Sequence, residues 1–136
     1  MPDVNIPWAA WYGDEDFKLK FPEEWEVEVA RMTDKEDIGD EGIEKSIKNP
    51  VNSPRLRDIA KGKKNAVIVV DDISRPTQAD RLLPHVFKEI EEGGIDRSSI
   101  KIILGLGAHR QMDKLDMEKK LGAEVLSEFE IHNHHP

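Results

Sequence analysis

Two apolar stretches, Ala66-Val67-Ile68-Val69-Val70 and Ile100-Lys101-Ile102-Ile103-Leu104, decide the fold. Both are rich in β-branched side chains, which is typical of strands buried on both faces of a parallel sheet. Between them, residues 80–92 carry apolar side chains at helical spacing, and Gly93-Gly94 ends that helix. Strand, helix and strand in this order predict a right-handed βαβ unit with parallel strands.

The same alternation continues toward the C-terminus. A helix is expected to begin near Asp113 and to carry Leu115, Met117 and Leu121 on its apolar side, with Gly122 just after its last turn. Phe129-Glu130-Ile131-His132 is predicted as the last strand. Residues 65–136 are therefore expected to form a βαβαβ arrangement, a mostly parallel sheet with flanking helices.

The first 32 residues predict an antiparallel hairpin or meander. Residues 16–21 and 25–32 both alternate apolar and charged side chains, the period of a half-buried strand, and Tyr12-Gly13-Asp14 is expected to form an earlier turn. The tryptophans of this region are best explained by core packing; they are Trp8, Trp11 and Trp25.

Residues 33–64 read as a polar, partly helical connection. Short helices are predicted over residues 42–47 and 54–60, the second with Ser53 as N-cap and Pro54 at the first helical position. The fold class is thus α/β, and a chain of 136 residues fits a single domain over residues 1–136.

Composition excludes several classes of function. The chain has no cysteine, so disulfides, thiolate metal sites and a cysteine nucleophile are ruled out. Its net charge of −8 makes it a poor binder of nucleic acid or of anionic membranes. No apolar run has the length of a membrane span, and the first residues do not resemble a signal peptide. These features favour a cytoplasmic protein.

Two loops follow the predicted parallel strands at their carboxyl ends, where open α/β sheets bind ligands. The first is Asp71-Asp72-Ile73-Ser74-Arg75-Pro76-Thr77. An arginine can hold a carboxylate or phosphate with two hydrogen bonds, and a neighbouring aspartate can orient it. A purely structural alternative is that one aspartate caps a turn and pairs with Arg75.

The second loop is Gly105-Leu106-Gly107-Ala108-His109-Arg110-Gln111-Met112. Glycine lets the backbone approach a ligand closely, and histidine suits general acid–base chemistry near neutral pH. The alternative is a histidine that only packs or pairs within the loop. The cluster His132-Asn133-His134-His135 matches no standard ligand spacing, so no metal site is assigned to it.

The two loops together resemble those of the nickel-pincer lactate racemase family, whose motifs here read DDISRPT at residues 71–77 and GLGAHR at residues 105–110. The flanking segments also match: NPVNSPRLRDIAKGKKNAVIVV before the first loop, LLPHVFKEIEEGGI between the loops, and a strand ending in Asn-His after them. Full members of this family are much longer, so the chain resembles only the front of the N-terminal domain.

The resemblance implies specific roles. Family members racemise or epimerise a 2-hydroxy acid by reversible hydride transfer to a nickel-pincer pyridinium mononucleotide. His109 matches a catalytic histidine that takes the hydroxyl proton. Arg75 matches the arginine that holds the substrate carboxylate, and Asp72 matches an active-site aspartate that orients the arginine or the histidine. The resemblance also places Asp72, Arg75, Thr77 and Gly107 at the cofactor.

Two functions remain open at this point. The chain is either the N-terminal part of a lactate-racemase-like isomerase, inactive alone because it lacks the C-terminal part of the enzyme, or a non-enzymatic α/β module. The module would bind a small anion or pair with a separate catalytic chain. The motifs for a second catalytic histidine, a cofactor-attached lysine and a nickel ligand are not found in this sequence.

Overall fold

The computed structural model describes residues 2–8, 15–30, 33 and 35–135. The chain divides into two compact units, residues 1–37 and residues 38–136, and each is described by itself. The boundary falls inside the segment expected to connect the β and α/β parts. Among the described residues, no helix is long and apolar enough to cross a membrane.

The first unit contains an antiparallel hairpin. Strand β1 (Asp3–Trp8) pairs with β2 (Glu15–Lys20), in a register that places Asp3 opposite Lys20 and Trp8 opposite Glu15. The rings of Trp8 and Phe17 contact each other, with centroids 5.3 Å apart. An antiparallel hairpin is thus present and the strand expected at residues 16–21 is confirmed, but its partner is residues 3–8, not residues 25–32. The turn expected at residues 12–14 and Trp11 lie outside the described residues.

Two expectations for this unit are wrong. Residues 25–30 form no strand in the structure, so the hairpin is not extended into a meander there. Alternation alone does not make a strand, because the backbone also needs a neighbour that accepts and donates its hydrogen bonds. Trp8 and Trp25 are both exposed rather than packed in a core. The ring of Trp25 lies against that of Phe21, just after β2, with ring centroids 6.1 Å apart.

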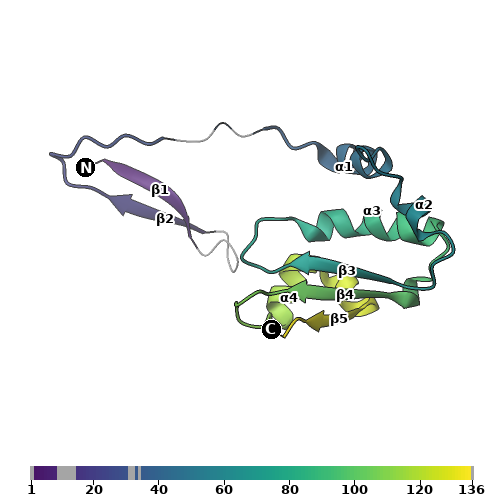
Figure 1. Ribbon diagram of the computed structural model, residues 1–136. Helices are drawn as coiled ribbons and strands as arrows, with labels where there is room; N and C mark the ends of the chain where they lie inside the picture. The colour runs from purple at the N-terminus through teal and green to yellow at the C-terminus, as the bar shows by residue number, and fades with distance from the viewer. Residues whose placement is uncertain (1, 9–14, 31–32, 34, 136) are drawn as a thin grey trace. The chain divides into compact units, whose positions relative to one another are not determined.

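The second unit is built on a three-stranded parallel sheet (Figure 1). The strands are β3 (Ala66–Asp71), β4 (Ile100–Gly105) and β5 (Glu130–Asn133), in the order β3-β4-β5. Both pairings are parallel, as predicted, and Asp71 lies opposite Gly105 in the register. The two loops singled out in the sequence therefore leave adjacent strands at the same edge of the sheet.

The sheet is covered on one face, not on both as expected. Ile102 and Leu104 are fully buried beneath the helices, whereas Val67 and Val69 on the opposite face are 55% and 70% exposed. The strand order explains this result. Both crossovers step in the same direction, from β3 to β4 to β5, and right-handed crossovers in one direction place their helices on one side of a sheet.

The three α-helices predicted before β4 are all present. They are α1 (Gly39–Lys48), α2 (Leu56–Ala60) and α3 (Ala79–Glu92), followed by the short 3-10 helix η1 (Arg97–Ser99). Ser53 is not the N-cap of α2, because α2 begins after Arg55 and shows no side-chain cap. The Ser53 hydroxyl instead lies near the carbonyl of Pro54.

The helix predicted after β4 is confirmed, with its end at Gly122, and a second helix follows it. Helix α4 (Lys114–Leu121) begins with a capping box in which Asp113 accepts from the Asp116 backbone, and Gly122 ends it with a φ of +87°. Helix α5 (Ala123–Glu128) follows at once and was not anticipated. Leu115, expected on the apolar side of this helix, is exposed.

The core lies between the covered face of the sheet and helices α3, α4 and α5. Phe87 of α3 and Phe129 at the end of α5 stack with ring centroids 4.1 Å apart. The guanidinium of Arg97 lies 5.0 Å from the centroid of Phe129 and binds Glu128 at 2.6 Å. This arrangement closes the end of the sheet from which β4 starts.

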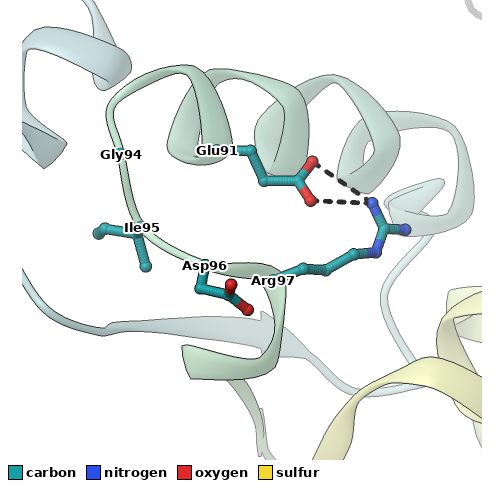
Figure 2. Close-up of a pocket in the computed structure, with 5 residues that line it drawn as sticks. All are labelled: Glu91, Gly94, Ile95, Asp96 and Arg97. Carbon is teal, nitrogen blue, oxygen red and sulfur yellow. Dashed lines mark hydrogen bonds and ion pairs between the residues drawn. The ribbon is translucent and has the colours of Figure 1, made fainter.

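A hollow of about 400 Å³ lies beside Arg97, between the end of α3 and η1, and is lined by Glu91, Gly94, Ile95, Asp96 and Arg97 (Figure 2). Each charged group that lines it already has a partner. Arg97 bonds both Glu91 oxygens at 3.4 Å, and Asp96 accepts from the Ser98 amide and hydroxyl. The hollow lies at the start of β4, at the end of the sheet away from the two loops.

Candidate functional site

The first loop is organised by Asp72, the residue that directly follows β3. Its side chain is buried, and its Oδ1 atom accepts hydrogen bonds from the Ser74 amide at 2.9 Å and from the Ser74 hydroxyl at 2.5 Å. The Arg75 amide donates to the Asp72 carbonyl at 3.1 Å. The loop therefore turns tightly at Asp72 and presents Arg75 at its outer side.

The second loop turns at a glycine. Gly107 has a φ of +55°, a conformation that side chains with a Cβ adopt only with strain, and the His109 amide closes the turn by donating to the Leu106 carbonyl at 3.0 Å. Leu106 is buried and anchors the loop, whereas the side chain of His109 is 57% exposed. The sequence pattern of glycines before a histidine thus places an accessible imidazole at the end of β4.

The two loops meet through one hydrogen bond. His109 Nδ1 lies 2.5 Å from Asp72 Oδ2, and the Ser74 hydroxyl lies 3.5 Å from the same nitrogen. Burial raises the pKa of the Asp72 carboxyl, but hydrogen bonds from Ser74 and His109 outweigh it, so its pKa lies below the usual value. An ionised Asp72 is only an acceptor, so the proton of a neutral His109 sits on Nδ1 and leaves Nε2 as the basic nitrogen.

Arg75 lies beside the Asp72–His109 pair. Neither a hydrogen bond nor an ion pair joins its guanidinium to any residue that the structure describes. A hollow of about 240 Å³ is lined by Arg75 together with seven other residues: Asp71, Asp72, Gly105, Leu106, Gly107, Ala108 and His109. The prediction that Asp72, Arg75 and His109 converge at one edge of the sheet is therefore confirmed.

The structure also separates the two possible partners of Asp72. The purely structural alternative, in which an aspartate caps a turn and pairs with Arg75, holds only for the cap. Asp72 orients the histidine, and the arginine remains available for an anion from outside the described chain. Thr77 is placed differently, since its hydroxyl donates to Asp71 Oδ2 at 2.7 Å and it does not line the hollow. Its role at a cofactor stays a prediction.

Comparison with known proteins now identifies the family. A family model described as the lactate racemase N-terminal domain matches residues 12–136. The chain belongs to the lactate racemase N-terminal domain family. Lactate racemase from Thermoanaerobacterium thermosaccharolyticum is 30% identical over 139 residues, which cover 98% of this chain and 32% of that protein. Lactate racemase from Lactiplantibacillus plantarum is 31% identical over 94 residues, 69% of this chain and 22% of the relative.

The fold agrees with that assignment. The apoprotein structure of the T. thermosaccharolyticum lactate racemase superimposes with a TM-score of 0.69 at 26% sequence identity, covering 98% of this chain and 30% of that one. The chain thus spans about a third or less of the length of these relatives. The fold of this lactate racemase N-terminal domain corresponds to the matched part of those proteins.

Sequence reasoning missed the residues that hold the two loops of this lactate racemase domain in place. Arg110 binds Asp116 of α4 with two hydrogen bonds, at 2.5 and 3.1 Å. Asn133, at the end of β5, accepts from the Met112 amide at 3.2 Å and donates to the Met112 carbonyl at 3.0 Å. Lys120 of α4 contacts the first loop. No local signal marks them, because charged residues one turn apart on a helix, such as Asp116 and Lys120, are normally exposed to solvent.

His132 and His135 do not line this hollow. His132 Nε2 lies 2.7 Å from Glu130 Oε1, and Lys101 binds the other oxygen of that glutamate at 2.7 Å, on the open face of the sheet. His135 contacts Gln111 at 3.0 Å. Within the described ranges, no group of three or more histidine, aspartate or glutamate side chains is arranged to hold a metal ion.

Proposed function

We propose that the chain forms the N-terminal, catalytic-site part of a lactate-racemase-like enzyme that inverts the hydroxyl-bearing carbon of a 2-hydroxy acid. One observation carries the proposal: the Asp72–His109 pair lines a hollow at the carboxyl ends of two parallel strands, together with Arg75, whose guanidinium has no partner among the described residues. A 2-hydroxy acid needs a cation for its carboxylate and a base for its hydroxyl, and these residues supply both.

Each residue has a separate task in this proposal. Arg75 binds the substrate carboxylate through its planar, two-pronged guanidinium. His109 Nε2 accepts the hydroxyl proton as the carbon–hydrogen bond breaks and returns it when that bond is remade. Asp72 keeps the Nδ1 proton in place and stabilises the imidazolium that forms in between.

The resemblance assigns a nickel-pincer pyridinium mononucleotide to the complete protein, where it would accept and return the hydride. The described residues could contact such a nucleotide on one side only. Arg75 and the backbone at Gly107 can face an anionic nucleotide, but the hollow is smaller than the roughly 300–1,000 Å³ of typical ligand sites. In the part of the chain that the structure describes, no cluster of side chains could hold nickel. The catalytic proposal for this chain therefore concerns proton transfer and carboxylate binding.

From this division of labour we expect the 136-residue chain to show no racemisation of lactate on its own. The cofactor-attaching lysine and the nickel ligand have no recognisable motif in it. Sustained interconversion of D- and L-lactate by the purified chain would contradict this expectation. A chain that binds lactate but supports no turnover in any longer protein would favour the non-enzymatic, anion-binding module.

The decisive experiment replaces His109 by alanine in the complete protein that carries this chain. We expect kcat for lactate racemisation to fall by roughly 10² or more, the usual scale for a positioned general base. The melting temperature should change little, because the exposed side chain of His109 contributes little packing.

His132→Ala provides a matched control, since His132 is also exposed and also paired with a carboxylate, but lies on the open face of the sheet. Its kcat should equal that of the unmodified protein. A His109→Ala protein with unchanged turnover and a lowered melting temperature would remove His109 from the mechanism and, with it, the proposed function of this site.

A further inference from the structure

Helix α4 presents two buried charged side chains, one turn apart, to the two loops of the site. Asp116 and Lys120 are only 2% and 4% exposed. Asp116 is bound by Arg110, which follows His109 in the second loop, whereas Lys120 reaches the first loop. Burying a charged group costs free energy unless it is paired and hydrogen-bonded, so both contacts are specific features of the fold.

The ammonium group of Lys120 lies among three oxygens, all from the first loop. It donates to the Arg75 carbonyl at 3.0 Å and to the Thr77 carbonyl at 2.9 Å, and it pairs with Asp71 Oδ1 at 2.8 Å. Two of its protons are thus donated to backbone carbonyls, and its charge faces the Asp71 carboxylate. Asp71 also accepts from the Thr77 hydroxyl, which closes the loop around the lysine.

From this arrangement we infer that Lys120 is a positioning residue, which fixes the backbone at Arg75 and thereby sets where the substrate carboxylate lies relative to His109. The inference rests on the proposed function, since it gives Arg75 its substrate. The guanidinium itself is anchored to no described residue, so its reach is determined by the backbone from which it extends. Lys120 holds that backbone at the carbonyl of Arg75 itself.

The lowered pKa of Asp71 agrees with its close contact to Lys120. Burial raises the pKa of the Asp71 carboxyl, but hydrogen bonds from Lys120 and Thr77 outweigh it and bring the pKa below its usual value. The carboxylate is therefore ionised at neutral pH and remains paired with the lysine. Without Lys120, two carbonyls of the first loop would each lose a donor, and Asp71 Oδ1 would lose the positive charge beside it.

The test compares Lys120→Met, which keeps the length of the side chain but removes its donors, with Lys114→Met, an exposed lysine at the start of the same helix. The first measurement is hydrogen exchange, and it needs no activity. In Lys120→Met, the amides of Arg75 and Ala79, which are bonded within the first loop, should exchange tenfold faster or more. The amide of His109 in the second loop and those of β4 should keep their rates, and Lys114→Met should change none of them.

The second measurement is the kinetics of lactate racemisation in the complete protein. A displaced Arg75 holds the carboxylate poorly, so KM for lactate should rise about tenfold or more, and kcat should fall less than in His109→Ala. A lysine that merely supported folding would lower the amount of active protein and leave KM unchanged. That result, or unchanged exchange at Arg75 and Ala79, would overturn the inference.

A second variant covers a failure of Lys120→Met to fold. Lys120→Gln keeps a donor for the carbonyls but gives up the charge opposite Asp71, and the same two readouts apply to it. If neither variant folds, Lys120 supports the whole unit rather than one loop, and the inference is wrong. If the unmodified protein does not racemise lactate, the proposed function fails, whereas the exchange rates still decide whether Lys120 orders the loop.

Discussion

The Asp72 carboxylate divides its two oxygens between the two loops of the site. Oδ1 holds the turn of its own loop through Ser74, and Oδ2 holds the imidazole of His109 from the neighbouring strand. An aspartate in this position does more than balance charge, because it decides which ring nitrogen carries the proton. The basic nitrogen of His109 is thereby directed away from Asp72.

Asp72→Asn tests whether Asp72 determines which ring nitrogen of His109 carries the proton. The amide keeps the size of the side chain but can donate a hydrogen bond to Nδ1, which favours the tautomer with the proton on Nε2. We expect kcat for lactate racemisation in the complete protein to fall by roughly 10² or more, with a small change in melting temperature. Nitrogen chemical shifts of His109, measured by NMR, report the tautomer directly, and an unchanged tautomer with unchanged kcat would contradict the assignment.

At the scale of elements, the close approach of α2 to α3 depends on a glycine at the end of α3. A Cβ atom at Gly93 would lie 2.5 Å from the Cβ of Ala60 and 2.6 Å from the carbonyl oxygen of Arg57. An ion pair between Arg55 and the buried Glu89 reinforces the same contact. Since the carbonyl belongs to the backbone, α2 would have to move to make room.

Gly93→Ala should therefore destabilise the second unit by about 1–3 kcal/mol, the usual cost of overpacking. Chemical denaturation measures this change in the free energy of unfolding. Gly105→Ala is the matched control, because a Cβ there would meet its neighbours at ordinary distances of 3.5 and 3.6 Å. Equal stability of the two variants would show that α2 is not held against Gly93 in solution.

Local sequence patterns predict most helices and strands, but they do not predict which face of the sheet the helices cover. Residues 66–70 and 100–104 are strands because their β-branched composition is a local property, and the loops after them meet because parallel strands end at one edge. Which face is covered depends on the order of the strands, a non-local property that a run of valines does not encode. The exposed Val67 and Val69 are the result of that order.

The candidate site shows the same limit. Asp72, Arg75 and His109 were identifiable, because each follows a predicted strand in a loop with a recognisable motif. Lys120 was not, since its partners are mostly backbone carbonyls 43 and 45 positions earlier, and nothing in the local sequence marks a lysine as buried. The sequence marks the end of α4 at Gly122 but not the helix α5 that follows, because six residues are too short to show a helical periodicity.

At the scale of the whole molecule, three buried carboxylates and the partly exposed Asp71 link stability to pH. Asp71, Asp72, Asp116 and Glu89 all have pKa values below their usual ones. Burial works against the ionised form at Asp71 and Asp72, but hydrogen bonds outweigh it. For Asp116 and Glu89, the largest cause is the hydrogen bond from an arginine, Arg110 and Arg55 respectively. The folded state therefore binds protons at these four groups less readily than the unfolded chain.

The sign of the pH effect follows from this difference. A carboxyl group with a lowered pKa stabilises the folded state fully above its unfolded pKa, which is 3.8 for aspartate and 4.5 for glutamate, and this contribution is lost as the pH falls through the folded value. We expect the melting temperature to be nearly constant between pH 7 and 5 and to fall steadily below about pH 4.5.

The net charge of −8 acts in the opposite direction, because protonation of exposed carboxylates in the same pH range relieves repulsion. At 0.15 M salt this repulsion is screened beyond roughly 8 Å, whereas the hydrogen-bonded pairs are in direct contact and are screened much less. Melting curves recorded at 0.15 M and 0.5 M salt should therefore show the same loss of stability in acid. A melting temperature that rises as the pH falls from 5 to 3.5 at either salt concentration would mean that surface repulsion outweighs these four hydrogen-bonded carboxylates.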